Sequence, residues 1–420
     1  MKFYISTLGC KVNTYESSVM CDALENAGYE KTNEIKSANI CILNTCTVTN
    51  TSDNKCLKVL RQLRRENKDA IIIVCGCMTQ VKKDIETLDA DIIVGNKYKS
   101  KIVDLINEYL INHKKIIKIE KLTNEFESMK LNNFDRTRAF VKIEDGCENF
   151  CTYCIIPYAR GPVRSKKPEL VIEEINDLVL KGHEEVVLTG IHTGHYGADL
   201  DDYNFADLLK ELVKISGLKR LRISSIEITE LTDEILDVIS NNNVIVDHMH
   251  IPLQSGSDEI LKSMNRKYDK NYFINKIEEI RKIRPDMSIT TDIIVGFPGE
   301  TSELFDETIE TVLKIRFSKI HVFPFSLRAG TKACELENHI DQVTKKERVK
   351  KLIEISKDLE IEYANKFVGK TLTYIPEIYK DGYIIGHTGN YLLIKEGGSK
   401  TDLYHEKEIT INAVEYPYCK

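Results

Sequence analysis

The feature of this 420-residue chain that most restricts its fold is a repeated alternation of short apolar segments with amphipathic helical segments. In residues 1–112, apolar strands are expected at 2–7, 39–43, 70–74 and 91–94, with helices between them. Such alternation predicts a parallel sheet flanked by helices, so residues 1–112 are interpreted as an N-terminal parallel α/β domain.

A second, longer series of the same kind follows. Expected strands lie at 140–143, 185–188, 220–224, 248–252, 289–295 and 319–324, with helical patterns between them. Six strands and six helices predict a partial (β/α)6 barrel over 136–368. Residues 113–135, rich in Lys, Asn and Glu, are interpreted as a linker. Short β-type segments after Gly369 predict a small all-β module over 369–420.

The charge and hydropathy of the chain limit where in the cell the protein is expected and which partners it can bind. The formal net charge is −6, so any contact with nucleic acid has to come from local basic patches. No run of about 18 apolar residues is present, and the first residues enter a strand pattern directly, with no secretory h-region. We therefore expect a cytoplasmic protein with no membrane partner.

Three of the twelve cysteines form one compact motif. Cys147, Cys151 and Cys154 have the spacing C-x3-C-x2-C and follow a predicted barrel strand, so they lie at the catalytic mouth of such a barrel. Three thiolates can hold three irons of a 4Fe–4S cluster and leave the fourth iron open to a substrate. The alternatives are zinc binding or a ferredoxin-type cluster, which require a nearby fourth ligand.

A second set of three cysteines is dispersed through the N-terminal domain. Cys10, Cys46 and Cys77 each directly follow a predicted strand, and ligands gather at the carboxyl ends of strands in open α/β sheets. We expect these three to ligate a second cluster. Cys75 is the competing third ligand, but it ends a continuous apolar run and is expected to pack in the core. The same core interpretation applies to Cys21, Cys41, Cys56, Cys334 and Cys419.

The C-x3-C-x2-C motif with Tyr153 before its last cysteine resembles the radical S-adenosylmethionine (SAM) superfamily. The two cysteine sets together resemble the radical SAM methylthiotransferases within it. Further matching segments are 7–13, 44–46, 76–80, 251–257, 292–301 and 323–326, and 386–391 resembles a TRAM domain. The resemblance covers nearly the whole chain.

The resemblance implies a function and its cofactors. Gly9-Cys10-Lys11-Val12-Asn13 is most similar to the branch that methylthiolates carbon 2 of N(6)-threonylcarbamoyladenosine, next to the anticodon of tRNA. The implied cofactors are two 4Fe–4S clusters and SAM, and the implied partners are tRNA and a reducing electron donor such as flavodoxin or ferredoxin. The alternatives are a sibling enzyme acting on isopentenyladenosine in tRNA or on a ribosomal-protein aspartate, and a non-catalytic cluster or zinc protein that binds RNA.

The resemblance also implies contacts to SAM, while the clusters carry the chemistry and no catalytic side chain is assigned. Gly190 ends the second barrel strand, where the family places the contact to the amine, although the common Gly-Gly-Glu is not present here. Ser225 and Glu227 end the third strand, where ribose hydroxyls are held; the alternative for Glu227 is a helix cap. The implied cofactor-binding residues are Tyr153, Gly190, Ser225, Glu227, Gln254 and Gly296.

Two basic groups are candidates for RNA phosphates, which dominate RNA affinity. Arg160, Arg164, Lys166 and Lys167 adjoin the radical motif and are favoured for that reason. A second group lies along the predicted helix near residues 55–68. In the C-terminal module acidic residues offset basic ones, so stacking on Tyr379, Tyr383 and Tyr391 would contribute more than charge.

Overall fold

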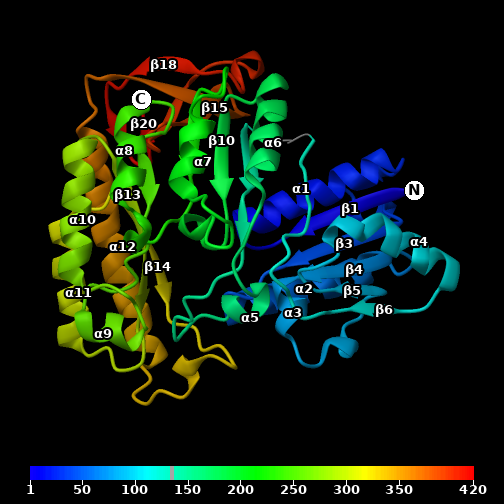
Figure 1. The fold of residues 1–420 in the computed structure, drawn as a ribbon. Coiled ribbons are helices and arrows are strands. Elements are labelled where there is room, and N and C mark those ends of the chain that lie inside the picture. The colour runs from blue at the N-terminus through cyan, green and yellow to red at the C-terminus, as the bar shows by residue number, and fades with distance from the viewer. Residues whose placement is uncertain (133–136) are drawn as a thin grey trace.

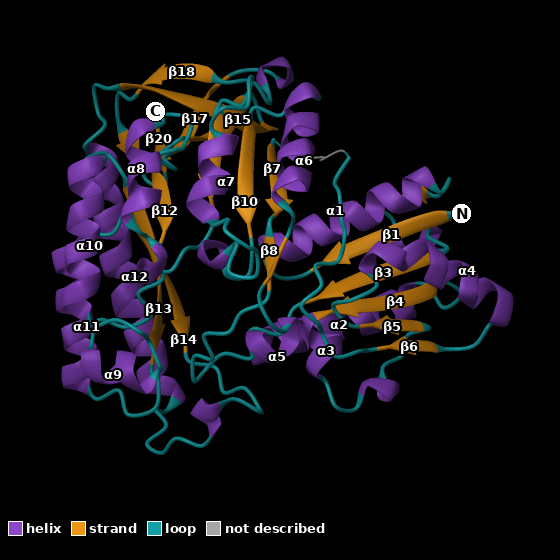
Figure 2. Ribbon diagram, viewed as in Figure 1, coloured by secondary structure: helices purple, strands orange, loops and turns teal. Residues whose placement is uncertain are grey.

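The computed structural model describes residues 1–132 and 137–420. Three parts follow one another along the chain: a parallel sheet with helices on both faces, an open barrel of parallel strands, and a small mixed sheet (Figure 1). Figure 2 shows the strand arrows of the first sheet pointing towards the barrel, and the small sheet across the barrel end where strand β10 begins. The predicted α/β fold class is confirmed.

The N-terminal sheet has the strand order β2-β1-β3-β4-β5-β6, and all its pairs are parallel. Its strands are β1 (Lys2–Thr7), β2 (Glu30–Lys31), β3 (Ile40–Thr45), β4 (Ile71–Gly76), β5 (Ile92–Val94) and β6 (Ile116–Lys118). The helices are α1 (Lys11–Asn26), α2 (Asn50–Glu66), α3 (Cys77–Val81) and α4 (Ile102–Asn112), with 3-10 turns η1 (Ile35–Ser37), η2 (Ile85–Thr87) and η3 (Lys99–Lys101).

Both faces of this sheet are covered, which explains the continuous apolar strands. β3 and β4 are buried at every position. Alternate residues enter two cores: Ile40 and Ile73 pack with α1 and α4, whereas Cys41 and Val74 pack with α2. Burial on both sides is typical of parallel sheets and requires apolar residues at successive positions.

The sheet extends beyond its predicted end at residue 112. The proposed linker at 113–135 contains β6, which pairs with β5 in parallel, and Ile116 packs in the same core as α4. The apolar pair Ile116–Ile117 was too short to stand out among the surrounding charged residues. Residues 133–136, at the end of the predicted linker and the start of the predicted barrel, lie outside the described residues.

The barrel consists of two parallel three-stranded sheets, β7-β10-β11 and β12-β13-β14. Single bridges, such as the one between Ser225 and His250, join β11 to the strand beside it. The strands are β7 (Arg138–Lys142), β10 (Glu185–Thr189), β11 (Arg220–Ile223), β12 (His248–His250), β13 (Ser288–Val295) and β14 (Lys319–Pro324), with a hairpin of β8 (Glu144–Asp145) and β9 (Arg164–Ser165).

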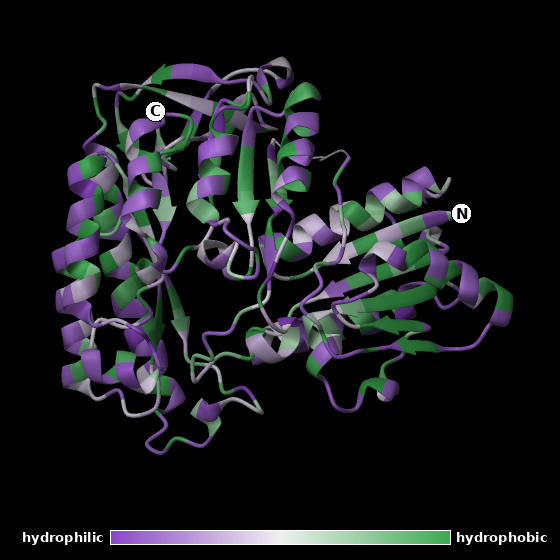
Figure 3. Ribbon diagram, viewed as in Figure 1, coloured by the Kyte–Doolittle hydropathy of each residue, from purple (hydrophilic) through white to green (hydrophobic). Residues whose placement is uncertain are grey.

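Helices follow the barrel strands, and most cover their outer side, whereas α5 lies beside α3 of the N-terminal domain (Figure 1). They are α5 (Ile156–Arg160), α6 (Pro168–Leu180), α7 (Phe205–Leu212), α8 (Asp233–Asn241), α9 (Asp258–Ser263), α10 (Lys270–Ile283), α11 (Ser302–Ile315) and α12 (Gln342–Asn365). The 3-10 turns are η4 (Thr193–His195), η5 (Ile228–Glu230) and η6 (Lys332–Cys334). Apolar residues gather on the strands of the first sheet and of the barrel (Figure 3). Among the described helices, none is long and apolar enough to cross a membrane.

The C-terminal module is a six-stranded mixed sheet of order β18-β15-β16-β17-β20-β19. Its strands are β15 (Thr371–Lys380), β16 (Tyr383–Thr388), β17 (Leu393–Gly397), β18 (Lys407–Thr410), β19 (Val414–Glu415) and β20 (Tyr418–Cys419), with η7 (Lys400–Asp402). Tyr391 lies in the β16–β17 turn with a φ of 70°.

The module docks on the amino ends of the barrel strands. The Arg220 guanidinium donates to Glu406 and to the Thr373 hydroxyl, both at 2.9 Å. The Tyr391 ring stacks on His248 with centroids 4.5 Å apart. The expectation that Tyr391 is available to stack on an RNA base is therefore wrong, because the ring is used to attach the module to the barrel.

Candidate active site

The carboxyl ends of the N-terminal strands bring three cysteines together. Cys10 follows β1, Cys46 follows β3, and Cys77 begins α3 directly after β4. Each thiol is close enough to influence the ionisation of another. Gly9 has a φ of 118°, and a Cβ there would lie 3.0 Å from the Cys46 Cβ, so only glycine allows these two loops to approach so closely.

The donor set fits a metal cluster. Burial raises the pKa of the Cys46 thiol; the pKa of the Cys10 thiol is also raised, by partial loss of hydration within the site although the residue itself is exposed, so both thiols favour the protonated form. A bound metal ion would displace those protons, and its positive charge would stabilise the resulting thiolates. Cys75, by contrast, is fully buried within β4 among the apolar residues of the core, as expected.

Arg160 is joined to this cysteine set. Its Nε donates to the Cys77 Sγ at 3.1 Å, and the Asn96 amide lies 3.5 Å from the same sulfur. The other guanidinium nitrogens donate to Glu16 and Asn13, each at 2.5 Å. Arg160 is fully buried, so its predicted contact with RNA phosphate is wrong in this structure, and its charge is directed at a thiol.

A buried network of charges surrounds this arginine. Lys142 donates to Glu16 at 2.9 Å and to Asp145 at 2.7 Å, and Lys99 also pairs with Glu16. Burial alone would favour protonated Glu16, but Arg160, Lys142 and Lys99 hold the pKa of this carboxyl well below its usual range. Glu16 lies on α1, Lys142 on β7 and Arg160 on α5, so the network attaches the N-terminal sheet to the barrel.

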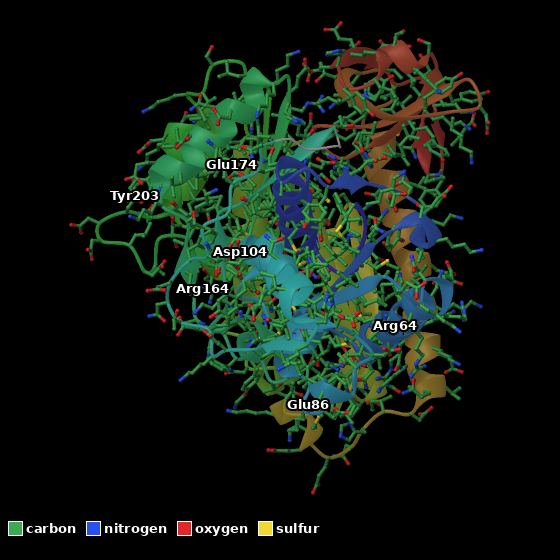
Figure 4. The ribbon with its side chains drawn as sticks, turned by 90° about the vertical axis from the view of Figure 1, so that its right-hand side faces the viewer. Arg64, Glu86, Asp104, Arg164, Glu174 and Tyr203 are labelled. Atoms are coloured by element: carbon green, nitrogen blue, oxygen red, sulfur yellow. The ribbon has the colours of Figure 1, made fainter. Side chains whose placement is uncertain are left out.

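Two other predicted RNA contacts are also paired internally. Arg164 is 4% exposed and donates to the backbone carbonyls of Arg160 and Pro162. Lys166 is 2% exposed and pairs with Glu174 on α6, which is labelled in Figure 4. Neither has a free cation for phosphate, because a charge this deeply buried requires an internal partner. Lys167 alone of the predicted four is exposed.

The C-x3-C-x2-C loop begins just past the end of β7. Gly146 has a φ of 97°, and a Cβ there would lie 1.9 Å from the Pro162 carbonyl oxygen. The Cys147 amide donates to the Gly161 carbonyl at 3.1 Å, and this bond joins the start of the loop to the residue that follows α5. Burial raises the pKa of the Cys154 thiol to about 12 and that of Cys147 still further. As in the N-terminal set, metal would be needed to hold these groups as thiolates.

Cys334, on the neighbouring turn η6, is not directed at this loop. Its thiol donates to the Arg328 carbonyl at 2.7 Å. The loop therefore offers three cysteines, which suits a cluster with one iron open to a substrate better than a four-ligand zinc or electron-transfer site.

Arg266, which no sequence motif indicated, lies against the loop. Its Nη1 is 3.3 Å from the Cys151 Sγ, and its other terminal nitrogen pairs with Glu227. Glu227 also caps η5, so the cap that the sequence offered as the alternative for this residue is present. Burial raises the pKa of Glu227 and Arg266 opposes that rise.

Glu144 is a second residue that the sequence reasoning missed. A Cβ on Gly190 would lie 2.6 Å from its Oε2, so the carboxylate fills the position that Gly190 leaves open. Oε2 accepts the His192 amide at 2.7 Å, while the buried Oε1 has no hydrogen-bond partner among the described residues. Burial raises the pKa of Glu144 well above its usual range. The sequence feature that could have identified Glu144 is its position, directly after the predicted strand 140–143 and three residues before Cys147.

The remaining predicted cofactor residues share this end of the barrel. Ser225, Gln254 and Gly296 follow β11, β12 and β13 respectively. Gln254 has a φ of 69° and its amide donates to the Asp292 carbonyl at 2.8 Å. Tyr153 packs with a small cluster that includes Phe297. The strand ends therefore collect the predicted residues on one face of the barrel.

The N-terminal sheet closes the open side of the barrel near this face. Arg328, in the loop after β14, donates to Thr47 at 2.5 Å and to Asn50 at 2.7 Å, and pairs with Asp53 at 2.8 Å. Thr47 directly follows Cys46. Contacts from α5 to Cys77 and from the loop after β14 to Thr47 therefore hold the N-terminal cysteine set against the end of the barrel that carries the C-x3-C-x2-C loop.

Comparisons with known proteins agree with this geometry. A model described as the Radical SAM superfamily matches residues 141–312, and one described as Uncharacterized protein family UPF0004 matches residues 2–95. The chain is 42% identical to the threonylcarbamoyladenosine tRNA methylthiotransferase MtaB of Bacillus subtilis (strain 168), over 98% of this chain and 94% of the relative. Its identity to the protein of that name from Thermotoga maritima is 40%, over 96% and 93%.

A more distant relative and a solved structure complete the comparison. The tRNA-2-methylthio-N(6)-dimethylallyladenosine synthase of Thermoanaerobacter pseudethanolicus is 37% identical over 89% of this chain and 82% of its own length. The fold resembles the radical SAM methyltransferase TsrM from Kitasatospora setae with a TM-score of 0.57 and 14% identity, covering 91% of this chain and 77% of that one.

The site and the matched superfamily define the class: this is a radical SAM enzyme, which implies a 4Fe–4S cluster and SAM as cofactors. More narrowly, the chain belongs to the family of radical SAM methylthiotransferases.

Proposed function

We propose that this enzyme methylthiolates carbon 2 of N(6)-threonylcarbamoyladenosine in tRNA, next to the anticodon, and uses two 4Fe–4S clusters and SAM. The observation that carries the proposal is the convergence of two three-cysteine sets on one site, with Arg160 in contact with Cys77 and placed on the helix that follows Cys154. The relatives named for the threonylcarbamoyl substrate include the two with 42% and 40% identity.

The ligand assignment follows the geometry. Cys147, Cys151 and Cys154 would hold the cluster that binds SAM, and Cys10, Cys46 and Cys77 the second cluster. When bound, these groups supply the radical and methylthio chemistry that no acid or base can provide at an aromatic C–H bond. The side chains described here hold those groups in place and keep water out.

Two further side chains are assigned to the bound cofactors. The unpartnered Glu144 Oε1 would accept a hydrogen bond from the SAM ammonium, beside Gly190 as the sequence implied. Arg266, which lies against Cys151, would stabilise the thiolate and fix Glu227 for a ribose hydroxyl. Ser225, Gln254, Gly296 and Tyr153 would complete that pocket.

The RNA surface is assigned differently from the sequence prediction. Lys55, Lys58, Arg61 and Arg65 are exposed on α2, whose first residues contact the loop after β14 beside the site. Arg64, labelled in Figure 4, is not part of this stripe because it pairs with Asp89 and Asp91. We propose that the α2 stripe, together with Lys167, binds tRNA phosphates.

The C-terminal module, residues 369–420, is proposed to be a TRAM domain that binds RNA through its exposed face, where Tyr383 is 45% exposed. The domain boundaries proposed are 1–118 for the N-terminal domain and 137–368 for the barrel. A reducing partner such as flavodoxin or ferredoxin would supply the electron.

The test is mass spectrometry of tRNA nucleosides from cells with and without this gene. Deletion should abolish the methylthio form of threonylcarbamoyladenosine, and the intact gene should restore it while a Cys151→Ala version should not. Loss of a methylthio group from isopentenyladenosine, or from a ribosomal protein, with the threonylcarbamoyl nucleoside unchanged, would establish a sibling activity instead.

A further inference from the structure

A cavity of about 310 Å³ lies at the amino ends of barrel strands β12, β13 and β14. The first turn of α1 and the β16–β17 turn complete its wall, so all three parts of the chain contribute to it. This volume is at the lower end of the range for small-molecule pockets. The polar residues that define it are Lys11, His248, His250, Thr290, His321 and Tyr391.

The cavity contains an uncompensated cation. Lys11 is partly buried, and its ammonium makes no hydrogen bond or ion pair with any residue in the described ranges. The neighbouring arginines are paired: Arg138 with Glu377 at 3.1 Å and Arg222 with Glu185 at 2.7 Å. Removing a cation from water without a partner is costly, so this arrangement suits an anionic ligand.

A second polar group in the wall also lacks a partner. His248 is 7% exposed; its Nε2 lies 3.2 Å from the Thr290 hydroxyl, and its Nδ1 has no hydrogen bond among the described residues. Burial and the cations nearby hold the pKa of His248 well below its usual range, so the ring is neutral. A neutral imidazole nitrogen suits a hydroxyl or an amide.

The carboxylates near the cavity do not cancel its charge. Glu360 at the rim pairs with Lys319 at 3.0 Å, and Asp292 faces His250 at 3.4 Å. Glu377 is shared between Arg138 and His387. Burial would raise the pKa of Tyr391, but Arg138, Lys11 and Arg222 together hold it below its ordinary value. The potential in the cavity is therefore positive.

Lys11 links the cavity to the second cysteine set, because its ammonium lines the cavity and is close enough to the Cys10 thiol to be influenced by its charge. Lys11 directly follows Cys10, so their Cα atoms are about 3.8 Å apart. An adenine whose carbon 2 faces the two cysteine sets has to direct the substituent on its N6 into the surrounding space. A threonylcarbamoyl substituent carries a carboxylate, a hydroxyl and an amide, whereas a dimethylallyl substituent carries no charge.

We propose that this cavity is the specificity subsite for the threonylcarbamoyl group, with the Lys11 ammonium paired to its carboxylate and His248 hydrogen-bonded to its hydroxyl or carbamoyl. This inference rests on the proposed function and extends it to the residues that select the substrate. A neutral substituent would leave the Lys11 ammonium without a counter-charge. Binding of such a substrate is therefore disfavoured, and this discrimination against the wrong substrate is part of specificity.

The test compares anticodon stem-loop RNAs that differ only at the modified adenosine. One carries threonylcarbamoyladenosine, the second its threonyl methyl ester, and the third dimethylallyladenosine. Methylthiolation kcat/KM and RNA affinity without SAM are measured for the reconstituted wild-type enzyme and for Lys11→Met, Lys11→Gln and Lys11→Arg. The exposed Lys36→Met, in the same domain, is the matched control.

We expect Lys11→Met and Lys11→Gln to lower both quantities about 10- to 100-fold for the carboxylate substrate and less than about threefold for the ester, the effect of one charged hydrogen bond. Lys11→Arg should retain most of the preference, and Lys36→Met all of it. Iron content and thermal unfolding show whether each variant is intact. If both neutral Lys11 variants fail to load iron, His248→Ala decides, because it should weaken the carboxylate and ester substrates alike by loss of a hydrogen bond that both can make, and no loss on either would overturn the subsite.

For the neutral Lys11 variants, equal losses on the carboxylate and ester substrates, or no loss on either, would overturn the subsite. A different result would overturn the proposed function itself: a wild-type enzyme that modifies the dimethylallyl RNA and not the threonylcarbamoyl RNA. The two failures are distinguishable because the first is read from the variants and the second from the wild type alone.

Discussion

Replacing Arg160 with methionine removes a cation that contacts both the Cys77 thiol and the buried carboxylates Glu16 and Asp145. Its loss breaks contacts of 3.1 Å to Cys77 and 2.5 Å to Glu16. Breaking a buried ion pair costs about 3–5 kcal/mol, and because Lys99 and Lys142 still face Glu16, we expect about 3 kcal/mol, or roughly a hundredfold in the folding equilibrium.

The measurement is urea unfolding of the anaerobically reconstituted protein, with iron content determined on the same samples. Arg160→Met should also load less iron, since Cys77 loses a hydrogen bond. The exposed Lys167→Met, seven residues later, should change stability by less than about 0.5 kcal/mol. If Arg160 and Glu16 act as a pair, Glu16→Gln combined with Arg160→Met should cost less than the sum of the single changes. A stability change under 1 kcal/mol for Arg160→Met, or strictly additive costs, would refute the reasoning.

Three other predictions follow from the same site. Cys77→Ala should lose about half the iron of a two-cluster enzyme and keep SAM cleavage, whereas Cys75→Ala should keep all the iron. Iron and sulfide analysis checks this, and full iron in Cys77→Ala with a one-cluster loss in Cys75→Ala would contradict it. Glu144→Gln should weaken SAM binding about tenfold by calorimetry, and unchanged affinity would remove Glu144 from the pocket. Because the pKa of Glu16 is depressed by folding, its contribution is present above the unfolded carboxyl pKa of about 4.3 and lost as the pH falls below it. Glu16→Gln should therefore flatten the stability profile below about pH 5, and an unaltered profile would count against the network.

The cysteine placements could be predicted because local patterns determined them. A continuous apolar run marked β4, and Gly76 marked its end, so the positions of Cys75 and Cys77 followed from periodicity. The arrangement of the barrel strands followed in the same way. Motif resemblance, rather than spacing, supplied the radical SAM chemistry.

The charged residues could not be predicted in this way. Arg160 and Arg164 look like a basic RNA-binding loop in sequence, yet their partners Glu16 and Asp145 lie in other elements. A side chain's burial depends on which elements pack together, and no local pattern encodes that. The same holds for Glu144, Arg266 and Lys11, whose roles arise only where strands, helices and modules meet.

The contact between Arg160 and Cys77 has a consequence for the order of synthesis. Residues 1–118 supply a complete parallel sheet and the whole N-terminal cysteine set before residue 160 is made. Domains generally fold as units during synthesis, amino end first. On the nascent chain, Cys77 therefore lies without its guanidinium partner, at a sheet edge that the barrel has not yet covered. Solvent reaches the Cys77 thiol at that edge until the barrel folds, after which Cys77 is 4% exposed while Cys10 stays exposed.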